Sequence, residues 1–319
     1  MRPPDRERGA ALLTVLLLVA VIAVMAATGL EKIRLATRLT MNATGIEQAR
    51  GYAEAAEALA LSKVDTLLGQ NPQRVTLAGG WSDAPFTLPL PGGAAVARVT
   101  DGANCFNLNG LVRTVAPGVY ATDPLARRQF ARLMRLLQIP PQVAEQVAAS
   151  AADWIDTDAD QQPGGAEDGA YLGQEPGYRT AGTLMTDSSE LRAVAGVTAD
   201  LYARLKPWIC ALPMAQPAPI NVNTLTPEQA PLLAMLAPDT LPVDTARGAL
   251  LRRPPQGFAD AGAFAGATGT ALAGVGVTSR WFTLRIDVTV NGADVHETAS
   301  IDARRLPARL VARQWGEDP

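Results

Sequence analysis

The longest apolar run of the chain lies close to its N-terminus. Residues Ala10–Leu30 form 21 positions without a charge, and Glu31 and Lys32 end the run. An α-helix of that length is about 31 Å long, which is enough to cross the hydrocarbon core of a bilayer. The run therefore predicts that the chain is anchored in a membrane by its N-terminal end.

The helical pattern continues beyond this run. No proline interrupts residues 31–68, and alanines recur at helical spacing at Ala49, Ala53, Ala56 and Ala60. The pattern predicts one helix of about 60 residues, half of it apolar all round and half amphipathic. A membrane anchor joined to a coiled-coil stalk is the alternative, but strict heptads with charged flanks are absent.

A first group of β-prone segments follows this helix. Short runs at Arg74–Leu77, Phe86–Leu90 and Ala94–Asp101 are separated by glycines and a proline. Each run is long enough for one strand, so the region predicts the first strands of a sheet.

The clearest strand pattern lies near the C-terminus. Apolar and polar residues alternate from Phe282 to Val290, and Asn291-Gly292 follows as a strong type I′ hairpin signal. Residues 294–302 and 309–315 complete a predicted three-stranded meander. One face of this meander is apolar, and we expect the C-terminal half of the long helix to cover it.

Helical patterns fill the middle of the chain. Helices are predicted at Pro124–Gln138 and Pro141–Ile155, and a second helical set at Ser188–Ala211. A third set begins at Thr226-Pro227-Glu228, with Thr226 as N-cap. The proline-rich segment Ala211–Pro219 indicates a linker between two small helical subdomains.

The strand groups lie on either side of these helices. The simplest arrangement is an α+β domain, with a long N-terminal helix packed on an antiparallel sheet and a large all-α insertion of two small helical subdomains. A string of separate domains is the alternative, but it leaves each group of strands short of a core.

The charge balance gives no support for nucleic-acid binding. The chain has 28 basic and 31 acidic residues, a net charge of −3, and nucleic acids require a basic surface. The two cysteines, Cys105 and Cys210, are expected outside the cytoplasm. There they pair as a disulfide or remain buried thiols.

The residues before the apolar run indicate how it is processed. Arg2, Arg6 and Arg8 lead into Gly9, and the small-residue cleavage site that a secretory signal needs after its apolar run is blurred. This arrangement resembles the leader of type IV prepilins and type II secretion pseudopilins, which a dedicated peptidase cuts after the glycine. The resemblance places the cut between Gly9 and Ala10. A plain membrane anchor and a cleaved secretory signal are the alternatives.

The densest group of possible metal ligands is acidic. Asp156, Asp158 and Asp160 alternate, and Glu167 and Asp168 follow a glycine-rich turn. The spacing partly matches an EF-hand loop, without its central glycine or its exiting helix. Hard oxygen ligands suit Ca²⁺, and the lack of nearby cysteine or histidine argues against zinc or copper. We predict one or two Ca²⁺ ions here, and a solvated acidic loop is the alternative.

Two other motifs offer weaker chemistry. His296 has no serine or cysteine motif around it and is expected to be a cross-strand surface residue, so no enzyme is predicted. Ile220–Thr224, with Arg252-Arg253 later, resembles the opening of helix-hairpin-helix DNA-binding modules. The corresponding turn, Leu236–Thr240, has no glycine and carries an acid. A membrane-anchored periplasmic protein of this kind, binding DNA or protein, is the alternative function.

Motifs along nearly the whole chain resemble the K-type minor pseudopilins of type II secretion systems, the GspK family. Thr14 occupies the fifth position after the expected cut, where most pseudopilins have glutamate and the K-type characteristically does not. The other motifs are Asn107-Leu108-Asn109, Asp153-Trp154-Ile155-Asp156, Gly165-Ala166-Glu167-Asp168, Ser189-Glu190-Leu191-Arg192, Cys210-Ala211-Leu212-Pro213 and Asn221-Val222-Asn223-Thr224.

The resemblance implies a pseudopilin fold whose helical insertion binds Ca²⁺. It implies a subunit at the tip of the periplasmic pseudopilus that initiates or caps assembly and limits pilus length. The implied partners are the I- and J-type minor pseudopilins and the prepilin peptidase. The implied location is the bacterial inner membrane, crossed once, with the C-terminal domain in the periplasm.

The expected division of the chain combines these inferences. It runs from leader (1–9), transmembrane helix (10–30) and periplasmic helix (31–70) through first strands (71–122), helical insertion with the acidic loop (123–215) and second helical subdomain (216–275) to the C-terminal meander (276–319).

Overall fold

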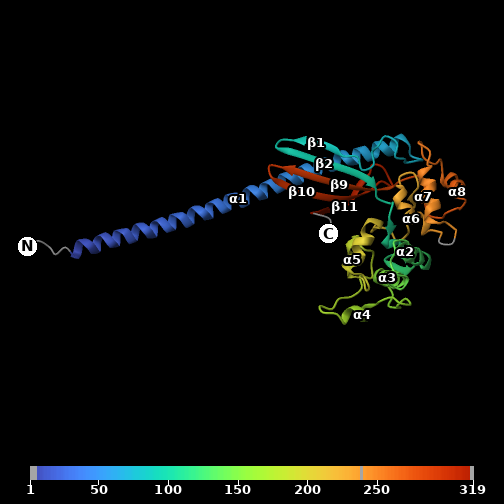
Figure 1. Cartoon of the computed structure of the whole chain (residues 1–319), viewed down its shortest axis with the longest axis horizontal. Coiled ribbons are helices and arrows are strands. Elements are labelled where there is room, and N and C mark those ends of the chain that lie inside the picture. The colour runs from blue at the N-terminus through green and yellow to red at the C-terminus, as the bar shows by residue number, and fades with distance from the viewer. Residues whose placement is uncertain (1–5, 238–239, 317–319) are drawn as a thin grey trace, which may run out of the picture.

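The computed structural model describes residues 6–237 and 240–316. A single helix, α1 (Arg6–Gln70), begins the chain, as the pattern predicts. Its first half projects away from the rest of the protein, and its second half lies along a sheet (Figure 1). Among the described residues α1 is the one helix long and apolar enough to cross a membrane, with a mean hydropathy of 2.9 in its most apolar window.

Five antiparallel strands form the main sheet, in the order β1-β2-β9-β10-β11. They are β1 (Phe86–Leu90), β2 (Gly93–Asp101), β9 (Trp281–Val290), β10 (Ala293–Asp302) and β11 (Arg309–Trp315). Although β2 and β9 are far apart in sequence, they are neighbours, and Asp101 lies opposite Phe282. The chain between Asp101 and Phe282 therefore leaves the sheet and returns to it at the same place. This confirms the α+β fold with an insertion.

Small residues let α1 approach the sheet closely. Ala49, Ala53, Ala56 and Ala60 are at most 1% exposed and pack on the inward residues of β9 and β10. Alternation along β9 places its apolar residues on this buried face, as the sequence predicts. We call the whole of α1 the spine. The head is the main sheet together with residues 47–70 of the spine.

The insertion begins after Asp101 and returns at the start of β9. Its elements, in chain order, are β3 (Phe106–Asn107), η1 (Leu108–Leu111), β4 (Val112–Ala116), β5 (Val119–Thr122), α2 (Pro124–Leu136), α3 (Pro141–Ile155), α4 (Asp168–Leu172), η2 (Ser188–Ala193), α5 (Ala199–Leu205), η3 (Lys206–Trp208), β6 (Ile209–Cys210), β7 (Ile220–Asn221), η4 (Pro227–Gln229), α6 (Ala230–Ala234), α7 (Val243–Leu251), α8 (Ala261–Thr268) and β8 (Val275–Gly276). Most of its buried apolar residues, from Phe106 to Phe264, form one cluster, while Leu212 and Ala218 pack with Ala103 and Trp281 in a small second one. Within it, the Phe106 and Phe130 rings stack with centroids 4.6 Å apart.

The structure differs from the sequence prediction in three places. Arg74–Leu77 is not a strand, because Val75 makes one backbone contact with Val277 and the chain then turns. The head sheet receives no strand from residues 102–122, whose β4–β5 hairpin belongs to the insertion. The helical set predicted over Ser188–Ala211 consists of η2, α5 and η3, with Gly196 at a φ of 85° between the first two, but its last residues form the short strand β6.

Candidate functional site

The acidic loop follows α3 directly. Asp153 lies in the last turn of this helix with no exposed surface, and Asp156 is its C-cap, 2% exposed. The loop is tied to β5, because the Thr157 amide donates to the Tyr120 carbonyl at 3.1 Å and the Thr122 hydroxyl donates to Asp156 Oδ2 at 2.7 Å.

A tight turn covers the Asp153 carboxylate. Both of its oxygens accept a hydrogen bond from the Gln162 amide, at 3.1 and 3.2 Å. A Cβ atom at Gly165 would lie 2.0 Å from Asp153 Oδ2, so only glycine permits this approach. This close approach explains why glycine occupies the first position of the Gly165-Ala166-Glu167-Asp168 motif.

Within the acidic loop, two buried carboxylate oxygens have no hydrogen-bond partner among the described residues. They are Asp156 Oδ1 and Glu167 Oε1. Buried polar atoms are nearly always satisfied, so these two oxygens stand out as unused acceptors. Burial first, and then repulsion by the neighbouring carboxylates, raise the pKa of Asp156 to about 6 and that of Glu167 to about 7. The donor set consists of hard oxygens and fits Ca²⁺.

The predicted ligands are not all assembled. Asp168 accepts hydrogen bonds from Arg179 at 2.7 Å and from Thr180 at 3.0 Å, and these contacts hold its pKa below the usual range. Asp158 and Asp160 are exposed, and the Asp160 amide donates to Asp158 Oδ1. Over the described ranges, no three His, Cys, Asp or Glu side chains converge enough to hold a metal ion.

Asp153 is the residue that sequence reasoning left out of the ligand set. Its charge raises the pKa of Glu167. Burial first, and then the charge of Asp156, raise the pKa of Asp153 itself to about 6. The signal was available, because residues three apart on a helix lie on one face, and Asp153 precedes Asp156 by three.

The base of the insertion is closed by a disulfide and by asparagines. Cys105 and Cys210 are bonded, with Cα atoms 5.8 Å apart. Beside them, Asn107 donates to the Met214 and Gln216 carbonyls and accepts from the Leu212 amide, all within 3.1 Å. Asn109 bonds Met185 in the same way. These side chains replace backbone pairing in a segment too irregular for a sheet.

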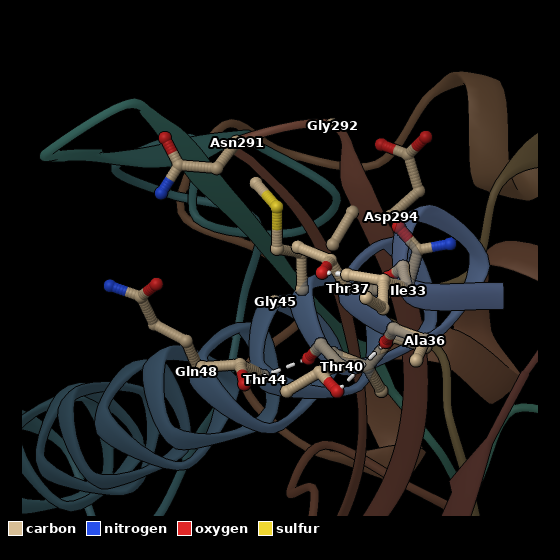
Figure 2. A pocket seen from close by; sticks show the side chains of 14 residues that line it. Ile33, Ala36, Thr37, Thr40, Thr44, Gly45, Gln48, Asn291, Gly292 and Asp294 are labelled. Atoms are coloured by element: carbon tan, nitrogen blue, oxygen red, sulfur yellow. Dashed lines mark hydrogen bonds between the residues drawn. The ribbon is translucent and has the colours of Figure 1, made fainter. Parts of the chain in front are cut away.

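The spine presents apolar side chains outside the predicted membrane span. Ile33, Leu39 and Met41 are each 60% exposed or more. A cavity of about 1010 Å³ lies between this stretch and the tip of the β9–β10 hairpin, as Figure 2 shows. Its helical wall carries Thr37, Thr40 and Thr44, whose hydroxyls donate back to carbonyls of the same helix. We call this cavity the spine notch.

The remaining motifs have structural partners. His296 faces Asp287 across the strands, with 2.7 Å between Nδ1 and Oδ1, as expected of a cross-strand surface residue. Arg253, which belongs to the helix-hairpin-helix resemblance, donates to the Val222 and Leu225 carbonyls. Asn221 is fully buried and bonds Val75 and Ser279. The turn at Leu236–Thr240 contains Pro238 and Asp239, which lie outside the described residues.

The structure describes only the last part of the predicted leader. Residues 1–5 are outside the described residues, while Gly9 and Ala10 belong to the first turns of α1. The Thr14 hydroxyl donates to the Ala11 carbonyl at 2.9 Å. Thr14 is thus satisfied within its own helix and offers no negative charge.

A spine helix with an apolar first half, packed on an antiparallel sheet that carries a helical insertion, defines the class: a pseudopilin. Two family models described as "Type II secretion system (T2SS), protein K" match residues 104–214 and 220–285. The chain belongs to this protein K family of minor pseudopilins.

Named relatives match most of the chain. The type II secretion system protein K of Pectobacterium carotovorum subsp. carotovorum is 32% identical over 320 residues, which cover 98% of this chain and 97% of the relative. The protein K of Aeromonas hydrophila is 38% identical over 258 residues, 79% of this chain and 78% of the relative.

A solved structure shows the same fold. The crystal structure of the GspK-GspI-GspJ complex from the type 2 secretion system of enterotoxigenic Escherichia coli contains a chain 34% identical to this one, with a TM-score of 0.74. The match covers 85% of this chain and 97% of that chain.

Proposed function

We propose that this minor pseudopilin occupies the tip of the periplasmic pseudopilus, where it initiates or caps assembly and limits pilus length during export of folded proteins. The observation that carries the proposal is the position of the insertion. It lies at the end of the head away from the apolar half of α1 (Figure 1). A further subunit added at that end of the head would meet the insertion and not the sheet or the spine.

Thr14 supports the same position. In pseudopilins with glutamate at this place, that acid pairs with the N-terminal amine of the neighbouring subunit. The Thr14 hydroxyl is already bonded to Ala11 and cannot supply the charge. A tip subunit has no neighbour above it and loses nothing by this exchange.

The partners follow from the relative of known structure, which was crystallised with GspI and GspJ. We propose that I- and J-type minor pseudopilins bind this chain as well. The exposed apolar stretch of the spine around Ile33, Leu39 and Met41 supports a helical partner, because these side chains lie beyond the 21-residue span that a bilayer covers. The spine notch offers such a helix a recess under the head.

Excision of the insertion tests the tip role. Gly102 N donates to the Trp281 carbonyl at 2.9 Å, so residues 102 and 281 are adjacent and a short Asn-Gly turn can join them in place of residues 103–280. We expect a folded head, longer pseudopili and impaired secretion. Unchanged pilus length and secretion, with the shortened chain present in the membrane, would contradict capping.

We also propose that the prepilin peptidase cuts between Gly9 and Ala10 and leaves the chain in the inner membrane with its head in the periplasm. The apolar half of α1 supports this topology. N-terminal mass spectrometry tests it directly. A mature N-terminus at Ala10 is expected, and an intact N-terminal methionine would contradict the proposal.

Calcium is the proposed ligand of the acidic loop. Asp156 and Glu167 would hold the ion through their unpartnered oxygens, with Asp158 and Asp160 beside them, and Asp168 would join after releasing Arg179. The ion would neutralise charges that otherwise repel each other in a half-buried loop.

A calcium titration of the full-length protein tests this proposal. Calcium is expected to raise the unfolding temperature, and Asp156→Asn or Glu167→Gln should remove the rise. Asp244→Asn is the matched control, because the Asp244 side chain is 92% exposed and remote in sequence from the loop. The site would be refuted if calcium raised the unfolding temperature of all variants equally, or if adding a chelator left the unfolding temperature of the wild type unchanged.

A further inference from the structure

Two buried carboxyl groups meet a single guanidinium between the spine and the last strand. Arg313 of β11 donates to both oxygens of Glu57 of α1, from Nε at 2.6 Å and from Nη2. Glu297 of β10 lies beside this pair. Its Oε1 is 3.5 Å from Arg313 Nε, and its side chain has no exposed surface.

Among the residues that the structure describes, neither carboxylate oxygen of Glu297 has a hydrogen-bond partner. Arg313 is already engaged in a two-point contact with Glu57, and Glu54 also approaches it at 3.4 Å. An ionised Glu297 would therefore be a second buried negative charge facing a cation that is already neutralised. Such groups avoid the cost of burial by keeping a proton.

Within the described ranges, the other elements around Glu297 bring no further cation toward it. Across the sheet Glu297 faces Ile286 of β9, while the neighbours of Ile286 along β9, Arg285 and Asp287, point to the opposite face. On α1, Arg50 pairs with Glu47 at 3.1 Å and lies over the Trp315 ring.

The strand that carries Arg313 also contacts the insertion. The next residue, Gln314, points to the other face of the sheet and donates to Asp187 Oδ2 at 2.7 Å. Asp187 is the N-cap of η2, where it also accepts from the Ser189 amide. Thus β11 is held to the spine through Arg313 and to the insertion through Gln314.

We propose that Glu57, Glu297 and Arg313 form a proton-dependent latch, in which one proton shared by the two carboxyl groups holds β11 on the spine and its loss loosens β11 and the contact with the insertion. The protonated Glu297 carboxyl donates to the Glu57 carboxylate, and Arg313 neutralises the remaining charge. No covalent bond changes, since the proton exchanges with solvent.

The pKa values of the two acids are shifted in opposite directions. Burial and then the adjacent Glu57 raise the pKa of Glu297 to about 8. Burial opposes ionisation of Glu57, but hydrogen bonds from Arg313 and Glu297 outweigh it and hold the pKa of Glu57 below its usual range. The stabilisation from Glu297 is complete below the unfolded pKa of about 4.3 and is lost as pH rises toward 8. The stabilisation from Glu57 is lost only in stronger acid.

Hydrogen exchange of the full-length protein in detergent tests the latch, with amide protection followed in residues 309–316. Glu297→Gln keeps the shape of the protonated acid, so wild type and variant are compared at each pH from 5 to 9, which cancels the intrinsic exchange rate. Relative to the variant, wild-type protection should fall by up to about tenfold for each pH unit between 5 and 8. Glu54→Gln, an exposed member of the same cluster, is the control and should follow wild type.

Two results separate the latch from a merely structural role. In Glu57→Gln, Arg313 becomes free to pair with an ionised Glu297, so the pKa of Glu297 should fall, and the loss of protection should become smaller and end at a lower pH. The infrared band of a protonated carboxylic acid, present in wild type at pH 7 with calcium added, should be absent from Glu297→Gln. The latch is overturned if wild type and Glu297→Gln show the same pH profile, or if their infrared spectra agree.

Discussion

Removal of the Cys105–Cys210 disulfide measures how firmly the base of the insertion is held. The bond joins residues 105 positions apart. Loop-closure entropy for a loop of about 100 residues corresponds to about 4.7 kcal/mol at 25 °C. A domain of this kind has a free energy of unfolding of about 5–15 kcal/mol, so the loss is a large share of the total. The hydrogen bonds of Asn107 and the β3–β6 pair remain, so the double variant Cys105→Ser/Cys210→Ser should still fold.

Urea unfolding of protein isolated from an oxidising compartment is the assay. With a denaturant slope of about 2 kcal/mol/M, the midpoint of the insertion should fall by about 2 M in the double variant. Wild type treated with a reductant is the matched control and should unfold at the same midpoint as the variant. Midpoints that agree within about 0.5 M between oxidised wild type and the double variant would refute the entropic reasoning.

Three substitutions test packing at other points. Phe130→Ala removes a fully buried ring from the core of the insertion and should lower the free energy of unfolding by about 3–5 kcal/mol, measured by the same urea assay. Gly45→Leu adds a side chain where a Cβ would already lie 3.2 Å from Ala293, so the β9–β10 hairpin should lose hydrogen-exchange protection while the insertion keeps its own. Gly165→Ala drives a methyl group against the Asp153 carboxylate and should abolish the calcium-dependent rise in unfolding temperature, and a retained rise would contradict the fit described for this turn.

Periodic patterns accounted for most of the head. The alternation in β9, the Asn291-Gly292 turn and the alanine spacing of α1 each express a local rule, and the structure follows all three. Arg74–Leu77 failed because a short β-prone run becomes a strand only when a neighbour pairs along its length, and the contact here is a single backbone hydrogen bond to Val277.

The candidate sites depend on tertiary contacts more than the head does. The acidic loop was visible in sequence, but the engagement of Asp168 by Arg179 was not, because the two are brought together only by folding. Glu297 offered a signal that was missed. It falls in phase with Val295, Ala299 and Ile301, on the buried side of β10, where an acid requires an explanation.

Imaging of assembled pseudopili tests the central claim most directly. A gold-labelled tag at the C-terminus of this chain reports where the subunit lies along each filament, with a tagged major subunit as control. The tip role predicts one label per filament, at one end only. Labels distributed along the filament length would contradict it.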